Sequence, residues 1–432
     1  MKTKIRFYNA RILDIKTGDV KKGALETENG KIVKVSYSSK GDSDKSGDSA
    51  YMREIDADGN LLIPSFKNAH SHSPMTILRA MAENVALNDW LFKIIFPLEA
   101  KLTEDDVYWG TKLAILEMLK SGITATFDMY FFTPSLAKAF KEAGFRASFC
   151  SAISGEDVNA SMKRLESEYD TINSYSPLIK YFAGCHAEYT ASEDLLKGIS
   201  TFVNDRKIPF YTHMSEAVGE TEGCIERRGV SPAVLFDRLG LWNYGGGVYH
   251  AVHVSDEDIA LMKKHNIFVT TNPCCNAKIA SGIAPVLKYI DNGITVGIGT
   301  DGPASNNSLS MFKEMYMLVC TQRLSQMKPD VMSAFKALQM ATVNSARIMG
   351  LDNALSLSEG QDADLVMIDM HSPNMQPESD IANNLVYAGG NELVLLTMVN
   401  GKILYEKGEF NIDVDPTDVY KKVNSIKERI NG

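Results

Sequence analysis

The stretch LLIPSFKNAHSH, residues 61–72, joins an apolar run to two histidines that flank Ser71. Residues i and i+2 of a strand point to the same side, so His70 and His72 can reach one ligand together. Segments with helical periodicity separate this run from seven similar ones, and eight such β-α repeats predict an α/β fold with a (β/α)₈ TIM-like barrel. The eight runs are LLIPSFKNAH (61–70), GITATFDMY (122–130), FRASFCSAIS (145–154), IKYFAGCHAE (179–188), IPFYTHMSE (208–216), GGVYHAVHV (246–254), IFVTTNPC (267–274) and TVGIGTDG (295–302).

Three amphipathic segments between the runs predict helices, at Glu104–Lys120, Ser192–Asn204 and Asp256–His265. The second and third open with a Ser or Asp of the kind that caps a helix. The gap at residues 71–121 is longer than one helix needs. Long insertions after barrel strands usually cover the active site, so we expect a lid around Trp90 to Glu99.

Both ends of the chain have strand-like patterns, from residue 1 to about 60 and again at 362–369 and 393–410. A polar loop is expected at 40–49 and a closing helix at Asp415–Ile430. Two short terminal pieces can bury an apolar face only against each other or the barrel. We therefore predict a small split β-sandwich domain from residues 1–64 and 355–432, and a catalytic barrel at 65–354.

The composition limits the partners of the protein. The net charge of −9 over 432 residues opposes nucleic-acid binding, which needs an excess of Lys and Arg. No apolar stretch is long enough to span a bilayer or to resemble a signal peptide, and the six cysteines form no CxxC pair. We expect a cytoplasmic enzyme with a small-molecule substrate, without a nucleic-acid or membrane partner, either monomeric or a homo-oligomer.

His213 and Asp301 lie at the ends of the fifth and eighth runs. Barrel enzymes build their sites at the carboxyl ends of the strands, where these two residues would meet His70 and His72. Singly, each could be a buried, partnered histidine or a helix cap, but four such groups on one rim favour a metal site. Three histidines and one carboxylate suit one divalent ion, Zn²⁺ or Fe²⁺, of which we expect zinc.

Two further residues suggest hydrolytic chemistry. Glu216 follows His213 closely enough to move a proton from a metal-activated water, although it could also be a solvated loop residue. His250 and His253 are three residues apart, which places them on opposite sides of a strand, so only one of them should face the site. We expect His250 to hydrogen-bond the attacking hydroxide, with the reverse assignment as the alternative. His186 ends the fourth run and either contacts substrate or lines the rim.

These residues stand in motifs that resemble the amidohydrolase superfamily, in its nucleoside and nucleobase deaminase branch, close to S-adenosylhomocysteine/5′-methylthioadenosine deaminases. The resemblance covers nearly the whole chain. It implies a barrel with a split β-sandwich, a single Zn²⁺ or Fe²⁺, and hydrolytic deamination of an amidine-like ring carbon. Its motifs are NAHSHSPMTILRA (68–80), PLEAKLTEDD (97–106), SGITATFDMYF (121–131), HMSE (213–216), HAVH (250–253), ASGIAPV (280–286) and GTDGPASNNSLSMFKEM (299–315).

The resemblance also implies roles for individual residues. Glu216 matches the proton shuttle, His250 the histidine that polarises the hydroxide, and Asp301 a base toward the water. Glu99 matches the position that holds the ribose 2′- and 3′-hydroxyls, and a carboxylate can accept both. The matching metal positions are His70, His72, His213 and Asp301, and the other substrate positions are Trp90, in the same lid, and His186.

Two departures concern the substrate. Ser151 stands where homocysteine-binding deaminases carry an arginine, a loss for which Lys163 or Arg164 could compensate. The stretch TTNPCCNAK lacks the histidine expected before Asn-Pro, so the pocket near Thr271 and Cys275 should differ. We expect an ammonia-releasing deaminase of adenosine-like nucleosides: adenosine, 5′-deoxyadenosine, methylthioadenosine or S-adenosylhomocysteine. The alternatives are a deaminase of guanine, a pterin or another ring, a triazine chlorohydrolase-like activity, and a non-catalytic barrel scaffold.

Overall fold

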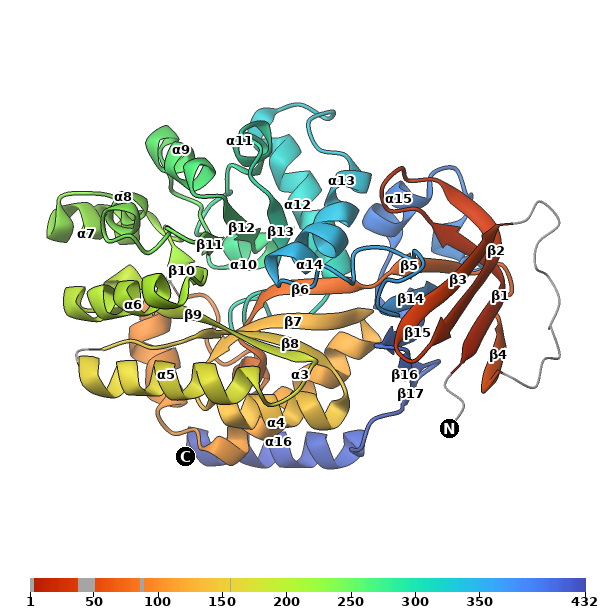
Figure 1. Cartoon of the computed structure of the whole chain (residues 1–432), viewed down its shortest axis with the longest axis horizontal. Coiled ribbons are helices and arrows are strands. Elements are labelled where there is room, and N and C mark those ends of the chain that lie inside the picture. The colour runs from red at the N-terminus through yellow and green to blue at the C-terminus, as the bar shows by residue number, and fades with distance from the viewer. Residues whose placement is uncertain (1–3, 38–50, 86–88, 156) are drawn as a thin grey trace.

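The computed structural model describes residues 4–37, 51–85, 89–155 and 157–432. The polar loop expected at 40–49 lies outside these residues. Two sheets organise the described chain: a parallel sheet wrapped by helices, and a mixed sheet built from both terminal segments (Figure 1). No helix in the described ranges is long and apolar enough to cross a membrane.

The parallel sheet contains eight strands in chain order, one from each of the eight predicted runs, which confirms the predicted barrel. The backbone N–H groups of Thr300 and Asp301, just after the last strand, both donate to the carbonyl oxygen of His70 on the first, at 3.1 and 3.0 Å. These two hydrogen bonds link the first and last strands of the parallel sheet and so help to close it into a barrel. The strands are β6 (Phe66–Ser71), β7 (Ile123–Tyr130), β8 (Arg146–Ser151), β9 (Ile179–Ala187), β10 (Phe210–Met214), β11 (Gly246–His250), β12 (Ile267–Thr271) and β13 (Val296–Ile298).

The first predicted run forms two strands instead of one. Leu61–Pro64 is β5 of the mixed sheet, and the barrel strand β6 begins only at Phe66. Proline has no N–H to donate to a ladder, which favours a change of sheet at this point. We propose this turn as the boundary between the β-domain and the barrel.

Helices follow the barrel strands and cover them (Figure 1). Glu104–Lys120 forms α3 as expected, and Ser192 caps α6 by accepting a bond from the Leu195 N–H at 3.2 Å. The cap of α9 is Ser255, not Asp256, because the Ser255 side chain bonds the Asp258 N–H. The helices of the barrel and its lid are η1 (Ser73–Leu78), η2 (Trp90–Ile95), α2 (Phe96–Glu99), α3, α4 (Thr133–Ala143), α5 (Val158–Asn173), η3 (Glu188–Thr190), α6 (Glu193–Arg206), α7 (Val218–Arg228), α8 (Pro232–Arg238), α9 (Asp256–Lys264), α10 (Pro273–Lys278), α11 (Val286–Asp291), α12 (Met311–Gln326), α13 (Ala334–Gln339), η4 (Met340–Asn344) and α14 (Ser345–Ile348).

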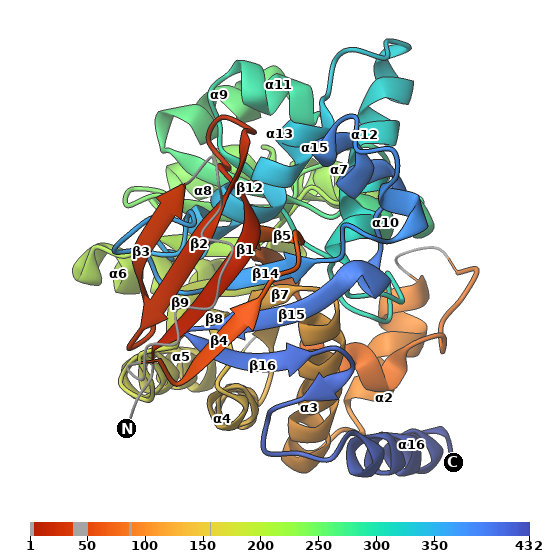
Figure 2. The same cartoon turned by 90° about the vertical axis from the view of Figure 1, so that its right-hand side faces the viewer.

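The mixed sheet has nine strands among the described residues, and it joins the two ends of the chain (Figure 2). β5 and β14 pair in its middle, so the N- and C-terminal segments share one apolar core that includes Phe7, Leu62 and Leu396. Its strands are β1 (Ile5–Leu13), β2 (Val20–Glu28), β3 (Lys31–Tyr37), β4 (Arg53–Asp56), β5, β14 (Leu365–Ile368), β15 (Val394–Val399), β16 (Lys402–Glu406) and β17 (Glu409–Phe410).

The last helices connect the β-domain back to the barrel. α16 (Pro416–Asn431) packs on α3 and not on the sheet, and the Lys101 ammonium donates to the carbonyl oxygen of Ile430 at 2.7 Å. A buried ion pair also links the barrel to the C-terminal segment: Arg146 of β8 pairs with Asp364, just before β14, at 2.7 Å. The remaining short helices are η5 (Pro373–Met375), α15 (Ile381–Asn383), η6 (Asn384–Ala388) and η7 (Asn391–Leu393).

Candidate active site

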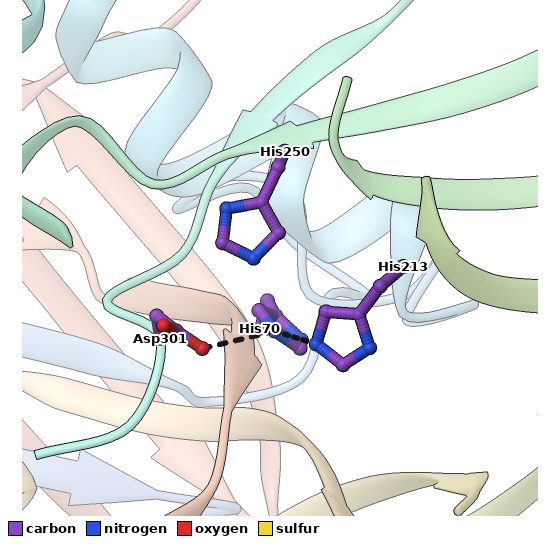
Figure 3. Close-up of side chains that lie close together, drawn as sticks. All are labelled: His70, His213, His250 and Asp301. Atoms are coloured by element: carbon purple, nitrogen blue, oxygen red, sulfur yellow. Dashed lines mark hydrogen bonds and ion pairs between the residues drawn. The ribbon is translucent and has the colours of Figure 1, made fainter. Parts of the chain in front are cut away.

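Buried polar side chains gather at the carboxyl ends of the barrel strands. Figure 3 shows that His70, His213 and His250, from three strands, and Asp301, from the segment after β13, point toward one another. One ligand atom from each lies within 4.8 Å of every other. His72 joins this group, with its Nε2 atom beside Asp301 and its ring next to those of His70 and His213. The structure therefore brings the four metal-ligand candidates together, with His250 beside them.

The spacing of these atoms fits a metal ion. The Nε2 atoms of His70 and His72 each lie 3.2 Å from Asp301 Oδ1, and His213 Nε2 lies 3.1 Å from His70 Nε2. Neighbouring ligand atoms of a tetrahedral zinc site are about 3.3 Å apart, because zinc–nitrogen bonds are about 2.0–2.1 Å long. Asp301 Oδ1 is also buried without a hydrogen-bond donor. A divalent cation would satisfy this oxygen and the facing imidazole nitrogens.

Backbone carbonyl groups fix which nitrogen His72 and His213 present to the cluster. His72 Nδ1 donates to the carbonyl oxygen of Met129, and His213 Nδ1 donates to that of His186 at 2.7 Å. A carbonyl oxygen can only accept, so both Nδ1 atoms carry the hydrogen. The lone pair of each ring therefore lies on Nε2, the atom that faces the cluster, as in metal sites whose histidines are oriented by backbone carbonyls.

Electrostatics hold three of the four ligand candidates in the form that binds metal, whereas His72 is protonated in the free protein. Burial lowers the pKa of His70 to about 3 and that of His213 well below its usual value, so both rings are neutral. Burial would raise the pKa of Asp301, but the imidazoles of His70 and His72 hold it well below its usual range. Burial opposes protonation of His72 too, yet Asp301 raises its pKa to about 9. An ion that binds His72 would therefore displace a proton.

His250 enters the cluster because the chain turns sharply at the end of β11. The φ angles of His250 and Ala251 are 69° and 47°, and that of Asp301 is 59°, a left-handed region that non-glycine residues rarely adopt. The strand ends at His250, so the strand alternation invoked for His253 does not extend that far. His253 instead donates from Nε2 to the Ser281 carbonyl oxygen at 2.6 Å, outside the cavity lining.

Glu216 lies buried beside His250, with its Oε1 atom 3.6 Å from His250 Nδ1. Burial raises the pKa of Glu216, which favours a carboxyl group that can hold a proton. Glu220 fixes the loop by accepting the backbone N–H groups of Ser215 and Glu216 at 2.7 and 2.8 Å. The Nδ1 of His250 is also held by Asn276 Oδ1, at 2.8 Å.

A cavity of about 590 Å³ opens above the cluster. The three substrate-contact candidates, Trp90, Glu99 and His186, all line it. Trp90 Nε1 and Glu99 Oε1 are buried without hydrogen-bond partners, and so is the hydroxyl of Tyr130 in the same lining. Burial raises the pKa of Glu99 to about 7, against the opposing influence of Tyr130 and His72. Polar atoms in this state are available to a ligand that carries hydroxyl groups.

The sequence motifs assigned Tyr130 and Ser305 no role at the site, and they placed Cys275 near the pocket without a partner. Tyr130 is the last residue of β7, a rim position, and that placement was the available signal. Cys275 Sγ donates to Asp301 Oδ2 at 2.9 Å, and the Ser305 hydroxyl donates to the same oxygen. Both come from segments that follow β12 and β13, and no spacing rule places them on the carboxylate.

Lys163 and Arg164, which could compensate for the arginine that Ser151 replaces, do not line the cavity. Lys163 is exposed on α5, and Arg164 Nε pairs with Glu168 on the same helix at 3.1 Å. No lysine or arginine of the described chain is part of the cavity lining. The undescribed stretches beside it in sequence, 86–88 and 156, contain no basic residue either.

Comparison with known proteins places this geometry in a family. The model of the amidohydrolase family matches residues 61–404. The chain belongs to the amidohydrolase family. This amidohydrolase is 37% identical over 358 residues to a 5-methylthioadenosine/S-adenosylhomocysteine deaminase of Dictyoglomus thermophilum, a match covering 82% of this chain and 84% of that one. It is 34% identical to a 5′-deoxyadenosine deaminase of Methanobrevibacter smithii, over 95% of this chain and 94% of the other.

A solved structure extends the likeness to the whole fold. An adenosine deaminase from Xanthomonas campestris with bound zinc superposes with a TM-score of 0.92 at 28% identity, covering 99% of this chain and 98% of its own. The resemblance noted from the motifs is thus confirmed at the level of the family and of its barrel fold. We therefore interpret the site as that of a hydrolase of the amidohydrolase family.

Proposed function

We propose that this amidohydrolase is a metal-dependent deaminase that removes the 6-amino group of the adenine ring of a nucleoside and releases ammonia. One observation carries the proposal: three imidazoles and a carboxylate at metal-site spacing lie beside a buried glutamate whose pKa is raised. The activities named for its relatives support the same reaction class.

The residues that would hold the ion are His70, His72, His213 and Asp301. When bound there, a zinc or iron(II) ion supplies Lewis-acid chemistry, which lowers the pKa of a water molecule toward neutrality. The Cys275 thiol and the Ser305 hydroxyl hold Asp301 Oδ2, which leaves Oδ1 turned toward the imidazoles of His70 and His72.

Glu216 transfers the proton in the reaction, and His250 orients the attacking water. Glu216 accepts a proton from the attacking water and delivers it to the ring nitrogen next to C6, a transfer that its raised pKa favours. His250, held through Nδ1 by Asn276, presents its other ring nitrogen to the attacking oxygen. The new C–O bond replaces the C–N bond, and the amino group leaves with one further proton as ammonia.

The lid supplies the nucleoside pocket. Glu99 would accept the vicinal ribose hydroxyls through its unpartnered Oε1 and its second oxygen, with Trp90 and Tyr130 available beside it. His186 lines the same cavity and contacts the Phe96 ring of the lid helix α2. A free base would leave Glu99 buried and unpaired, an arrangement that costs binding energy.

The rest of the cavity favours an uncharged 5′-substituent. Many of its lining residues are aromatic or aliphatic, including Leu91, Phe96, Phe131 and Phe132. A homocysteine carboxylate would find no lysine or arginine in the described lining, and an unpaired charge is costly to desolvate. We therefore infer that 5′-deoxyadenosine and methylthioadenosine are preferred to S-adenosylhomocysteine.

The test is an activity screen with metal-loaded protein. Ammonia release and the adenine-to-hypoxanthine absorbance change are measured on adenosine, 5′-deoxyadenosine, methylthioadenosine and S-adenosylhomocysteine, with guanine and a pterin as other rings. Glu216→Gln is the matched inactive control. Turnover of guanine or the pterin with none of any adenosine derivative would falsify the proposal, and S-adenosylhomocysteine as the best substrate would refute the inferred preference.

A further inference from the structure

A second group of side chains that could bind a metal ion shares His250 with the first group. The ligand atoms of Glu216, His250 and Cys275 lie within 4.8 Å of one another, and all three side chains are buried. This set differs in chemistry from the His₃Asp cluster because it contains a thiol. Sulfur ligands favour zinc and other thiophilic cations over magnesium or calcium.

We propose that Cys275, His250 and Glu216 form a second metal site, which takes up a thiophilic divalent cation such as Zn²⁺ or Cd²⁺ when that cation is in excess. Ligand atoms of a tetrahedral site with one sulfur lie about 3.3–3.6 Å apart. Closing the set around an ion therefore needs shifts of about 1 Å or less in the three side chains.

The geometry of His250 permits this second use. Its Nδ1 is the ring nitrogen near Glu216 and Asn276, whereas the other nitrogen faces the first cluster (Figure 3). On binding, Cys275 loses its thiol proton to solvent and a sulfur–metal bond forms, with no change of oxidation state. His250 must also give up its Nδ1 hydrogen bond to Asn276 Oδ1, and its ring hydrogen moves to the other nitrogen so that the Nδ1 lone pair can face the ion. The thiol also gives up its hydrogen bond to Asp301 Oδ2, although the Ser305 hydroxyl still holds that oxygen.

An ion bound at this second site would inhibit the reaction. An ion bound to Glu216 occupies the carboxylate that moves the proton, so excess cation should inhibit turnover. This consequence rests on the proposed deaminase function, whereas binding of the ion does not. Binding of the ion and inhibition of turnover can therefore be tested separately.

The experiment titrates the zinc-loaded protein with Cd²⁺ or Co²⁺ in the absence of substrate and follows thiolate-to-metal charge-transfer absorption together with metal content. We expect about one further equivalent to bind with a thiolate band. Cys274→Ser should keep the band, because Cys274 lies on the same helix but is not part of the cluster. Cys275→Ser should abolish the band while retaining the first zinc, since a serine hydroxyl can still bond Asp301.

Glu216→Gln provides an independent variant. It should keep the thiolate band but weaken Cd²⁺ binding by about tenfold or more, equivalent to about 1.4 kcal/mol. In activity assays, excess Zn²⁺ should inhibit the wild-type protein and Cys274→Ser but not Cys275→Ser. The absence of a thiolate band in the wild type, or its persistence in Cys275→Ser, would overturn the proposal, whatever the deaminase assay shows.

Discussion

Replacement of Glu99 by alanine tests how the enzyme would recognise a sugar. Glu99 is 9% exposed, and its Oε1 has no hydrogen-bond partner in the free protein. The change removes the carboxylate from the lid helix α2 and leaves the metal cluster untouched. Substrates with a 2′,3′-diol should therefore lose affinity, and matched substrates without the diol should not.

The size of the loss follows from the state of this carboxylate. With a pKa of about 7, Glu99 is mostly ionised at pH 8. A hydrogen bond to a charged acceptor contributes about 1.5–3 kcal/mol, and two hydroxyls can donate. Taking the lower value for each gives about 3 kcal/mol, or a loss of about 100-fold in kcat/KM at about 1.4 kcal/mol per decade.

The assay compares kcat/KM for 5′-deoxyadenosine and for its 2′,3′-dideoxy analogue in wild-type protein and in Glu99→Ala. Glu99→Gln is the matched variant, because it keeps one carbonyl acceptor without the charge and should lose less than Glu99→Ala. The analogue should change by about threefold or less in either variant, since it lacks the interacting hydroxyls. An equal loss on both substrates would show that Glu99 supports the lid and does not bind the ribose.

Four further outcomes are expected. Glu216→Gln should lower kcat by about 10²–10⁴ with metal content unchanged, because it removes the proton carrier and no proposed ligand of the first metal; loss of the metal would contradict this role. Asp301→Asn should weaken metal affinity by about 100-fold or more in chelator competition, and unchanged affinity would remove Asp301 from the ligand set. The preference for 5′-deoxyadenosine over its dideoxy analogue, measured as the ratio of their kcat/KM values, should rise as the pH increases through about 7. Above that pH Glu99 is ionised and is the better hydrogen-bond acceptor, and Glu99→Gln should show no such pH-dependent rise. Arg146→Ala should lower the unfolding free energy by about 3–5 kcal/mol in denaturant melts, since Asp364 would be left buried and unpaired, and a change below about 1 kcal/mol would show that the pair is relaxed by water.

The sequence determined the architecture because the relevant signals are local and periodic. Eight apolar runs separated by helical segments specify a parallel barrel, and each run supplied one strand of that barrel. His70 and His72 could be assigned to one side of a strand from their spacing alone. The carboxyl-end rule then directed His213 and Asp301 to the same rim, where the structure brings their ligand atoms together.

Only the tertiary structure decided the direction and partners of the remaining side chains. The left-handed φ of His250 turns it into the cluster where strand alternation no longer applies, and the run at 61–70 changes sheet at Pro64. Cys275 reaches Asp301 across 26 positions of sequence, and Tyr130 and Glu99 line one cavity from separate elements. Such contacts depend on the packing of whole elements, and sequence periodicity carries no information about distances between them.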